Sequence, residues 1–388
     1  MSHAPISAKT DAVDVPGPQV VVIGLGATGS AALYHLARRG VRAVGIEQFE
    51  IGHDRGSSHG ETRMIRLAHF ERPSYVPLMR RAYALWYELE NTVQQKLVHI
   101  TGIAEIGQPT GEVVRGTRAG ANADLPCEVL DAASLMRRYP VFKIPQSFVA
   151  IFQPDGGFID ARAALAANIA VAKERGAVVR TGEKVIAVEQ ARAGVKIVTD
   201  RGAIAADFTI VAAGPWLSGL LPDLQLPLTV TRQVVAWFEP QQPERFAADR
   251  FPTFMFESEY GHHYGFPAYG AKGIKFAKHH HLGEAVNADS RERTVSARDE
   301  AAIRAPLAQC LPAANGPMRA AETCLYTMTP DNTFVIDQVP GFPQIVVASP
   351  CCGHGFKFSP VVGEILAELV TRGTTQHDIA QFRLARFS

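Results

Sequence analysis

Residues 20–30, with the sequence Val-Val-Val-Ile-Gly-Leu-Gly-Ala-Thr-Gly-Ser, constrain the fold of this chain more than any other stretch. Four β-branched residues run directly into Gly24, Gly26 and Gly29, a helix-like segment follows, and a second apolar run ends at Glu47. This is the G-x-G-x-x-G pattern in a strand–turn–helix–strand setting, closed by an acidic residue about 20 residues after the glycines. The pattern predicts a doubly wound α/β fold that binds an adenine dinucleotide.

Each residue of this motif has a physical role in such a site. Gly24 permits the tight turn, Gly26 lets a pyrophosphate approach the backbone, and Gly29 lets the helix pack close to the strand. The helix N-terminus then faces the phosphates, and Glu47 can accept hydrogen bonds from the ribose hydroxyls. The motif alone leaves NAD, NADP and FAD open, although Glu47 disfavours NADP because a carboxylate would repel a 2′-phosphate.

Composition excludes several classes of function. The chain has 388 residues, enough for about two domains of ordinary size. Its net charge of +1 and its lack of Lys/Arg-rich runs argue against nucleic acid and against anionic membrane surfaces. No apolar stretch approaches the ~18 residues that a membrane span requires. We expect residues 1–18 to form a flexible tail, and the five cysteines, which follow no zinc-site pattern, to indicate a cytoplasmic protein.

A Gly/Ser-rich loop that turns basic follows Glu47 in the sequence. Arg63 and Arg66 are three residues apart, so on a helix they would share one face. Two arginines beside a dinucleotide site can hold a phosphate, a flavin edge or a substrate carboxylate. The alternative is a solvated basic face, which the residues by themselves leave open.

Hydrophobic periodicity predicts the other elements of the chain. Asp160 is expected to cap the helix that follows it. The patterns predict helices at 30–40, 74–92, 129–138, 161–175 and 359–370, and strands at 98–107, 177–181, 185–189, 195–199, 206–210, 229–238, 252–257, 262–267, 273–278, 334–337 and 345–348.

The region from about 228 to 321 differs in texture from the rest of the chain. Strand-like pieces alternate there with prolines and turns, which predicts an antiparallel sheet inserted into the nucleotide-binding fold. The expected division is a tail at 1–18, a discontinuous cofactor-binding domain at 19–92, 145–222 and 322–388, and a substrate domain at 93–144 and 223–321. His279, His280 and His281 are consecutive and would alternate faces on a strand, so we expect no metal site.

Four motifs occur in one order along the chain. They are the glycine motif, Ser58-His59-Gly60-Glu61-Thr62-Arg63 with Arg66, Thr323-Cys324-Leu325-Tyr326-Thr327 followed by Asp331, and Gly353-His354-Gly355-Phe356-Lys357. Together they resemble the monomeric sarcosine oxidase and N-methyltryptophan oxidase family of D-amino-acid-oxidase-like flavoproteins, over residues 20–377. The resemblance implies an α/β fold with an FAD-binding, two-dinucleotide (Rossmann-like) domain and an inserted antiparallel-sheet α+β substrate domain.

The resemblance also implies roles for individual residues. Cys324 matches the cysteine that forms a thioether to the flavin, and Arg66 and Lys357 match the pair that binds the substrate carboxylate. Lys275, with Arg63, matches the cations at the reactive edge of the flavin, where Lys275 is implied to activate oxygen. Cofactor contacts are implied for Gly24, Gly26, Gly29, Glu47, Ser57, Thr62, Arg63, Gly353, Gly355 and Lys357, and substrate-cavity or catalytic positions for His59, Met255, Tyr264, His279, Tyr326 and Gly353.

The chain departs from the family pattern in three places, which bear on substrate identity rather than on reaction type. These are residues 67–70, His262 with His263, and Cys351 with Cys352.

The resulting hypothesis is a cytoplasmic FAD-dependent amine oxidase, monomeric or weakly oligomeric. Its substrate would be an N-methyl or secondary L-amino acid that carries a carboxylate, and O₂ would be reduced to H₂O₂. The alternatives are a cyclic imino acid (pipecolate or proline) oxidase, an NAD-linked dehydrogenase, which has no use for Cys324, and a non-enzymatic nucleotide-binding protein, which has no need of Arg66 and Lys357.

Overall fold

Strand β1 (Val20–Ile23) lies inside a six-stranded sheet, and all four of its side chains are buried. Its neighbours run parallel to it, and only the edge pair β19–β20 is antiparallel. A strand covered on both faces needs no polar alternation, which explains the uninterrupted apolar run. The order is β19 (Val335–Val339), β20 (Phe342–Ser349), β13 (Phe208–Val211), β1, β2 (Ala43–Ile46) and β9 (Val178–Arg180).

The two faces of this sheet pack against different layers. Val20 and Val22 join a core with four helices, whereas Val21 and Ile23 join a core with a three-stranded antiparallel sheet. The helices are α1 (Ala27–Arg38), α2 (Val76–Val93), α5 (Ala161–Glu174) and α8 (Ser359–Arg372), and the covering strands are β10 (Val185–Gln190), β11 (Val195–Thr199) and β12 (Gly202–Ala206). The expected α/β nucleotide-binding layer is therefore present.

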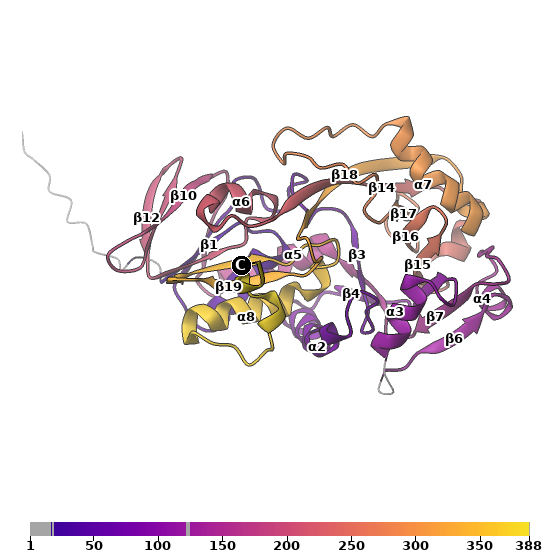
Figure 1. Cartoon of the computed structure of the whole chain (residues 1–388), viewed down its shortest axis with the longest axis horizontal. Helices are drawn as coiled ribbons and strands as arrows, with labels where there is room; N and C mark the ends of the chain where they lie inside the picture. The colour runs from indigo at the N-terminus through magenta and orange to yellow at the C-terminus, as the bar shows by residue number, and fades with distance from the viewer. Residues whose placement is uncertain (1–16, 18, 122–124, 388) are drawn as a thin grey trace, which may run out of the picture.

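A second, eight-stranded sheet forms the other lobe of the molecule (Figure 1). Helices α4 (Ala132–Arg138) and α7 (Ala297–Cys310) share one hydrophobic core with it, and α3 (Glu112–Ala121) contacts β5 and β7. The strand order is β18 (Met318–Met328), β14 (Thr229–Phe238), β17 (Ile274–Lys278), β16 (Gly261–Phe266), β15 (Thr253–Ser258), β5 (Ile103–Gly107), β7 (Val149–Gln153) and β6 (Glu128–Asp131).

A small antiparallel sheet carries the basic loop between the lobes. Its strands are β3 (Thr62–Ile65), β8 (Gly157–Asp160) and β4 (Val98–Ile100). Arg63 lies on strand β3 and Arg66 follows its end, so the condition for a shared helix face is not met. On a strand, residues three apart point to opposite sides, which gives each arginine a different environment.

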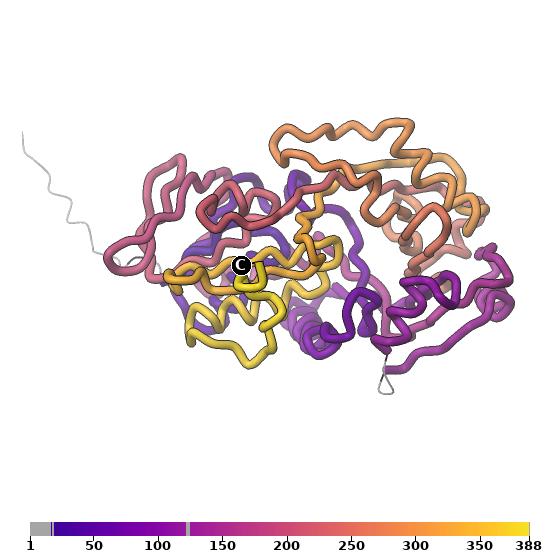
Figure 2. Tube along the Cα trace, in the orientation of Figure 1, coloured from indigo at the N-terminus to yellow at the C-terminus, as the bar shows by residue number. Residues whose placement is uncertain are grey.

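The tube view shows how separate chain segments build the nucleotide-binding lobe (Figure 2). Segments from the beginning, the middle and the end of the chain lie side by side there, as the strand order β20-β13-β1 requires. The computed structural model describes residues 17, 19–121 and 125–387, so the predicted tail lies almost wholly outside the described residues.

The secondary-structure predictions need three corrections. The predicted helix at 129–138 begins as strand β6, which pairs with β7, and becomes helix α4 only after Asp131, whose side chain accepts a hydrogen bond from Ser134 N at 2.7 Å. The predicted strand at 98–107 is divided between two sheets at Gly102, where φ is +73°. Helices α3 and α7 were not predicted. Asp160 does cap α5, as expected.

The inserted sheet also differs from the prediction. It is mixed rather than purely antiparallel, because β15 runs parallel to β5. Strands β7 and β18 pair within this sheet, although the predicted limits at 145 and 322 placed β7 and most of β18 with the cofactor-binding domain. The predicted domain limits followed changes in the sequence pattern, whereas membership of a sheet depends on pairing between distant strands.

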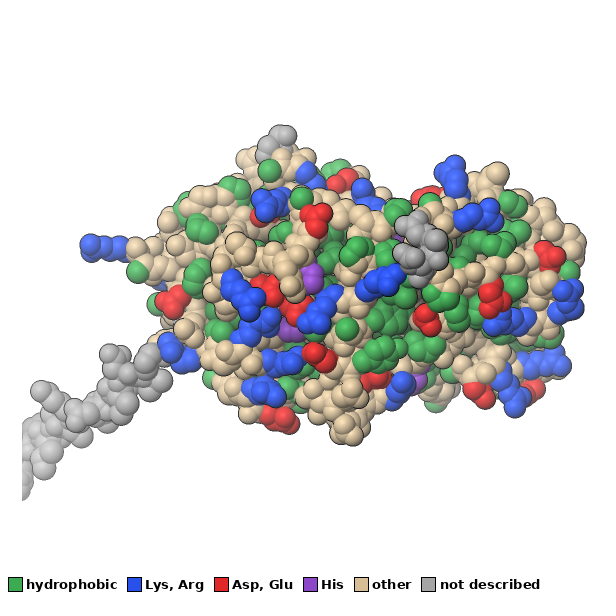
Figure 3. Space-filling view, turned by 90° about the horizontal axis from the view of Figure 1, so that it is seen from below, with side chains coloured by type: hydrophobic (Ala, Val, Ile, Leu, Met, Phe, Trp, Pro, Cys, Tyr) green, Lys and Arg blue, Asp and Glu red, His purple; other side chains and the backbone are tan. Residues whose placement is uncertain are grey.

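One face of the molecule displays positive and negative side chains in alternation (Figure 3). This mixture agrees with the net charge of +1. None of the helices within the described residues is long and apolar enough to cross a membrane.

Candidate active site

One continuous cavity lies between the six-stranded sheet and a face of the eight-stranded sheet. The ends of β1 and β2, the loop before β3, strands β14 to β18 and the turn after β20 all contribute to its wall. Every predicted site residue except Gly29 lines this cavity. The fold therefore brings together residues that are more than 300 positions apart in the sequence.

At the nucleotide end of the cavity, the turn from β1 to α1 depends on a close backbone approach. A Cβ on Gly29 would lie 1.8 Å from the carbonyl oxygen of Gly24, so no other residue fits there without moving the turn. The N-cap of α1 is Gly26, which supplies no capping side chain, and Gly26, Ala27 and Thr28 line the cavity, so the N-terminus of the helix lies at its wall. Glu47 is 4% exposed and accepts hydrogen bonds from Leu25 N at 2.9 Å and Phe49 N at 3.1 Å.

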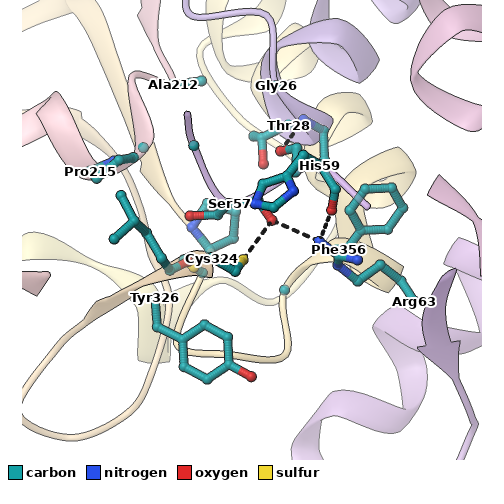
Figure 4. A pocket seen from close by; sticks show the side chains of 18 of the residues that line it. Gly26, Thr28, Ser57, His59, Arg63, Ala212, Pro215, Cys324, Tyr326 and Phe356 are labelled. Carbon is teal, nitrogen blue, oxygen red and sulfur yellow. Dashed lines mark hydrogen bonds between the residues drawn. The ribbon is translucent and has the colours of Figure 1, made fainter. Parts of the chain in front are cut away.

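Farther along the cavity, Cys324 lies close to His59 and Arg63 (Figure 4). Its Sγ lies 3.8 Å from the carbonyl oxygen of Ser57, which also accepts a hydrogen bond from Arg63 at 3.1 Å. Glu322, two residues before Cys324 on β18, lies 3.6 Å from His59 Nδ1. The thiol is thus surrounded by cationic groups.

These neighbours change the acidity of the thiol. Burial raises the pKa of Cys324, but the nearby imidazole of His59 and the charges of Arg63 and Lys275 outweigh it and lower the pKa to about 7. For His59, burial lowers the pKa, whereas Cys324 and Glu322 raise it, to about 9. The pair therefore favours a thiolate beside an imidazolium.

Lys275 is buried on β17 near the middle of the cavity. Its Nζ donates a hydrogen bond to the carbonyl oxygen of Thr62 at 3.0 Å and lies 5.5 Å from the ring centre of Trp237 and 5.0 Å from that of Phe266. Burial, and secondly the charge of Arg63, lowers the pKa of Lys275 to about 7. This lysine is poised to change charge near neutral pH.

Arg66 lies at the far end of the cavity between two carboxylates. Its Nη2 donates to both carboxylate oxygens of Glu71, at 2.8 and 2.9 Å, and its Nε lies 3.3 Å from Glu105 Oε1. Arg66 is 2% exposed and Glu105 is fully buried. The guanidinium is therefore held on two sides before any ligand arrives.

Lys357 is a second buried cation near Arg66, and its ammonium group is fixed by a hydrogen bond to a backbone carbonyl group. Its Nζ donates to the carbonyl oxygen of His354 at 2.8 Å, and its own carbonyl oxygen accepts from the Trp86 indole at 2.9 Å. Burial, and secondly the charge of Arg66, lowers the pKa of Lys357 to about 7. The backbone at Lys357 is thus fixed, while its ammonium faces the cavity.

Tyr326 and His279 form another part of the cavity wall, and Tyr326 lies two residues after Cys324 on β18. His279 Nδ1 lies 3.3 Å from the Tyr326 hydroxyl, and burial lowers the pKa of His279 well below its usual value, so its ring is neutral. A Cβ on Gly353 would lie 2.6 Å from the Tyr326 ring and 2.7 Å from the His279 ring. Burial raises the pKa of Tyr264, on the neighbouring strand β16, to about 12, which keeps its hydroxyl protonated.

Three acidic residues at the site were missed at the sequence level: Glu71, Glu105 and Glu322. Glu105 could have been found, because it is the one charged residue in the apolar run Ile-Ala-Glu-Ile of strand β5, and a buried charge requires a partner. Glu71 and Glu322 lie in polar surroundings that carry no such indication. Within the described ranges, no group of three or more His, Cys, Asp or Glu side chains is arranged to hold a metal ion.

Comparison with known proteins assigns this architecture. The model of the family described as FAD dependent oxidoreductase matches residues 19–369. The chain belongs to the FAD-dependent oxidoreductase family. The chain is 39% identical over 373 residues to monomeric sarcosine oxidase of Bacillus sp. (strain NS-129), covering 95% of this chain and 96% of that protein. It is 34% identical over 374 residues to N-methyl-L-tryptophan oxidase of Salmonella enteritidis PT4 (strain P125109), with coverages of 95% and 99%.

Solved structures agree with this assignment. NikD, described as an unusual amino acid oxidase essential for nikkomycin biosynthesis, superposes in its open form with a TM-score of 0.84 at 25% identity, covering 94% of this chain and 97% of that chain. L-Proline dehydrogenase from P. horikoshii superposes with a TM-score of 0.83 at 22% identity, covering 96% and 98%, and shares the fold. The predicted fold class and family resemblance of this FAD-dependent oxidoreductase are confirmed.

The residues along the cavity fit FAD. The glycine turn and the N-terminus of α1, where Ala27 N donates a hydrogen bond to Ser58 Oγ at 3.0 Å, suit a pyrophosphate. A Cβ on Gly26 would lie 2.9 Å from the same Ser58 Oγ in the narrow space there. At the other end, both ring nitrogens of His59 and the hydroxyl of Ser57 are buried and lack a hydrogen-bond partner among the described residues. Such groups suit a polar ligand that fills the space between them.

Proposed function

We propose that this FAD-dependent oxidoreductase oxidises the C–N bond of an N-methyl or other secondary L-amino acid. The observation that carries the proposal is the pair of buried cations, Arg66 and Lys357, at the end of the cavity beyond Cys324. Two buried cations in the wall of one cavity suit a carboxylate. Both relatives named above oxidise N-methyl amino acids according to their names, which supports the same substrate class here.

The walls of the cavity support an amine at the position next to the carboxylate. The rings of Tyr264, Tyr326 and His279, with the side chain of Met255, line this part of the cavity. The raised pKa of Tyr264 and the lowered pKa of His279 keep both groups neutral at pH 7, so neither repels the amine. We propose that these residues hold the amine and that Arg66 and Lys357 hold the carboxylate.

When bound, FAD accepts a hydride equivalent from the substrate and passes two electrons to O₂, which yields H₂O₂. For an N-methyl substrate, hydrolysis of the resulting imine releases formaldehyde and a primary amino acid. The Nζ of the buried Lys275 donates a hydrogen bond to the carbonyl oxygen of Thr62 at 3.0 Å. We propose that this lysine supplies positive charge where oxygen is reduced.

The proposed reaction is tested by assays of the purified protein with sarcosine, N-methyltryptophan, pipecolate and proline. We expect O₂-dependent H₂O₂ from at least one of the two N-methyl substrates, with one formaldehyde for each H₂O₂. Turnover of pipecolate or proline alone would instead identify a cyclic imino acid oxidase. Turnover that requires NAD and yields no H₂O₂ would contradict the proposal.

We further propose that Cys324 binds the flavin covalently. In such a reaction the thiol would lose its proton, a C–S bond would replace one C–H bond of the flavin 8α-methyl group, and the two electrons released would pass to O₂ to give H₂O₂. The lowered pKa of Cys324, beside His59 and Arg63, supplies the thiolate that such a reaction requires. The structure leaves Cys324 otherwise unbonded, as a free thiol.

Acid precipitation tests the covalent bond directly. We expect the yellow colour to remain with the wild-type pellet and to be released or lost in Cys324→Ala. Cys310→Ala, which changes a buried thiol outside the cavity, serves as the matched control and should keep its colour. A colourless wild-type pellet would contradict the assignment.

We also propose that the enzyme is cytoplasmic and monomeric or weakly oligomeric. The described residues include five free cysteines and no disulfide, which fits a reducing compartment. Size-exclusion chromatography with light scattering tests the oligomeric state, and a stable dimer at low concentration would contradict it.

A further inference from the structure

Glu105 is a buried carboxylate to which the proposed reaction assigns no role. It lies on strand β5 and is fully buried, and its Oε2 accepts a hydrogen bond from Gln153 Nε2 at 2.6 Å. Its Oε1 lies 3.3 Å from Arg66 Nε, yet among the described residues neither of these two atoms makes a hydrogen bond of normal geometry. A buried carboxylate with one unsatisfied oxygen costs free energy of folding, so its presence calls for an explanation.

The two carboxylates that hold Arg66 are not equivalent. Glu71 lines the cavity and forms two hydrogen bonds with the guanidinium, whereas Glu105 lies behind Arg66 and does not line the cavity. A ligand carboxylate that enters the cavity can therefore replace Glu71 at the guanidinium. It cannot reach the position of Glu105, which stays beside Arg66 whether or not a ligand is bound.

The ionisable and polar groups that act on Glu105 come from several elements around it. They are the guanidinium of Arg66, the carboxylate of Glu71, the amide of Gln153 on β7, the hydroxyl of Thr117 on α3, the thiol of Cys127 and, farther away, the ammonium of Lys357. Burial raises the pKa of Glu105 to about 7, although Arg66 lowers it, and Glu71 raises it further. Glu105 therefore exchanges its proton near neutral pH.

We propose that Glu105 takes up a proton when a substrate carboxylate binds to Arg66. The inference rests on the proposed role of Arg66 in holding that carboxylate. An incoming anion lies next to the guanidinium that stabilises ionised Glu105, and it competes for the same positive charge. Protonation of Glu105 keeps the net charge of this buried group small and frees Arg66 to pair with the ligand.

The coupling has a definite sign. Below the midpoint of its titration Glu105 is neutral and the ligand meets the full charge of Arg66, whereas above the midpoint an ionised Glu105 opposes the ligand. The affinity for a carboxylate therefore falls as pH rises, with a limiting slope of about tenfold in Kd per pH unit for one coupled proton. Loss of the Lys357 proton acts in the same direction, since its pKa is also about 7, so a variant is needed to separate the two groups.

The experiment uses the FAD-loaded enzyme and methoxyacetate, which has the shape and carboxylate of sarcosine but an ether oxygen in place of the amine. Its Kd is measured from flavin absorbance between pH 6 and pH 9. Calorimetry in buffers of different ionisation heat then gives the number of protons taken up. Glu105→Gln keeps the size and a hydrogen-bond acceptor toward Arg66 but removes the charge.

We expect Glu105→Gln to bind methoxyacetate roughly three- to tenfold more tightly than wild type at pH 8.5, with little difference at pH 6 and with reduced proton uptake. Gln153→Glu places a second carboxyl group against Glu105. In this variant the midpoint of the pH dependence of Kd should lie higher than in wild type. Methoxyacetamide, the uncharged analogue, should bind without proton uptake.

A purely structural role for Glu105 would give weaker binding in Glu105→Gln by the same factor at every pH, and that result would overturn the inference. Unchanged proton uptake in the variant would overturn it too, while leaving the clamp of Arg66 and Lys357 intact. If wild type binds methoxyacetate no better than methoxyacetamide, the proposed carboxylate clamp itself fails, and the role of Glu105 fails with it.

Discussion

The two cations at the substrate end differ in how firmly they are held. Arg66 lies between the carboxylates of Glu71 and Glu105, whereas the Nζ of Lys357 donates a hydrogen bond to the carbonyl oxygen of His354 at 2.8 Å. Within the described residues, no carboxylate forms an ion pair with Lys357, so its positive charge is available to a ligand. Its contribution to binding a carboxylate should accordingly exceed what its single hydrogen bond suggests.

Lys357→Met should raise the KM for a carboxylated secondary amine by roughly tenfold or more, because a charged hydrogen bond in a buried site is lost. Steady-state peroxide assays measure the change. Lys272→Met, which alters a half-buried lysine paired with Glu322 outside the clamp, is the control and should leave KM nearly unchanged. An unaltered KM in Lys357→Met would refute the role of this lysine.

Lys275→Met should slow the reaction of the reduced enzyme with O₂ by roughly 100-fold, because a preorganised positive charge is removed. Reduction by substrate under anaerobic conditions should change much less. In wild type the oxygen reaction should slow as pH rises through about 7, since burial lowers the pKa of Lys275 to that value and the ammonium is lost above it. Stopped-flow reoxidation checks both effects, and equal slowing of both half-reactions would speak against an oxygen-specific role.

At the scale of elements, helix α3 supports the segment that carries Glu71. A Cβ on Gly116 would lie 2.5 Å from the carbonyl oxygen of Phe70, and one on Gly120 would lie 2.7 Å from that of His69. These glycines lie about one helical turn apart, so α3 offers a smooth surface to the backbone of residues 69–70. The packing of one helix thus sets the position of the clamp.

Gly116→Ala should move this segment and raise KM several-fold, even though alanine in a helix normally stabilises by about 1 kcal/mol relative to glycine. We expect a net loss of roughly 1–3 kcal/mol in the free energy of unfolding, because the clash is with backbone. Denaturant unfolding and kinetics measure the two effects. Gly219→Ala, in a helix with open space around it, is the matched control, and identical behaviour of the two variants would contradict the argument.

Elements with strong local patterns were predictable, whereas partnerships between elements were not. The run at 20–23 and the Asp160 cap depend on neighbouring residues and were predicted correctly. The parallel pairing of β5 with β15, and the membership of β18 in the eight-stranded sheet, depend on residues at least 80 positions apart, which no local pattern specifies. Helix α3 was not predicted because its four small residues, two of them glycines, conceal a helical pattern.

At the scale of the whole molecule, the cavity exists only because two sheets from interleaved chain segments face each other. The family motifs identified the residues that line it, but not the environment of each one. The resemblance marked Arg66 as a carboxylate ligand, for example, but the pairing with Glu71 and Glu105 appears only when strands β3 and β5 are placed together. The charge state of a buried site is thus a property of the assembled fold.

We propose that the cavity as a whole binds a carboxylated secondary amine against FAD and oxidises it. The most direct measurement is anaerobic mixing of the purified enzyme with sarcosine or N-methyltryptophan, and with the corresponding amides, while the absorbance of oxidised flavin is followed. We predict that at least one of the two acids abolishes this absorbance, that the amides do so far more slowly, and that air restores it with one H₂O₂ per flavin. Retention of the absorbance with both acids, or equal rates for acids and amides, would contradict the account.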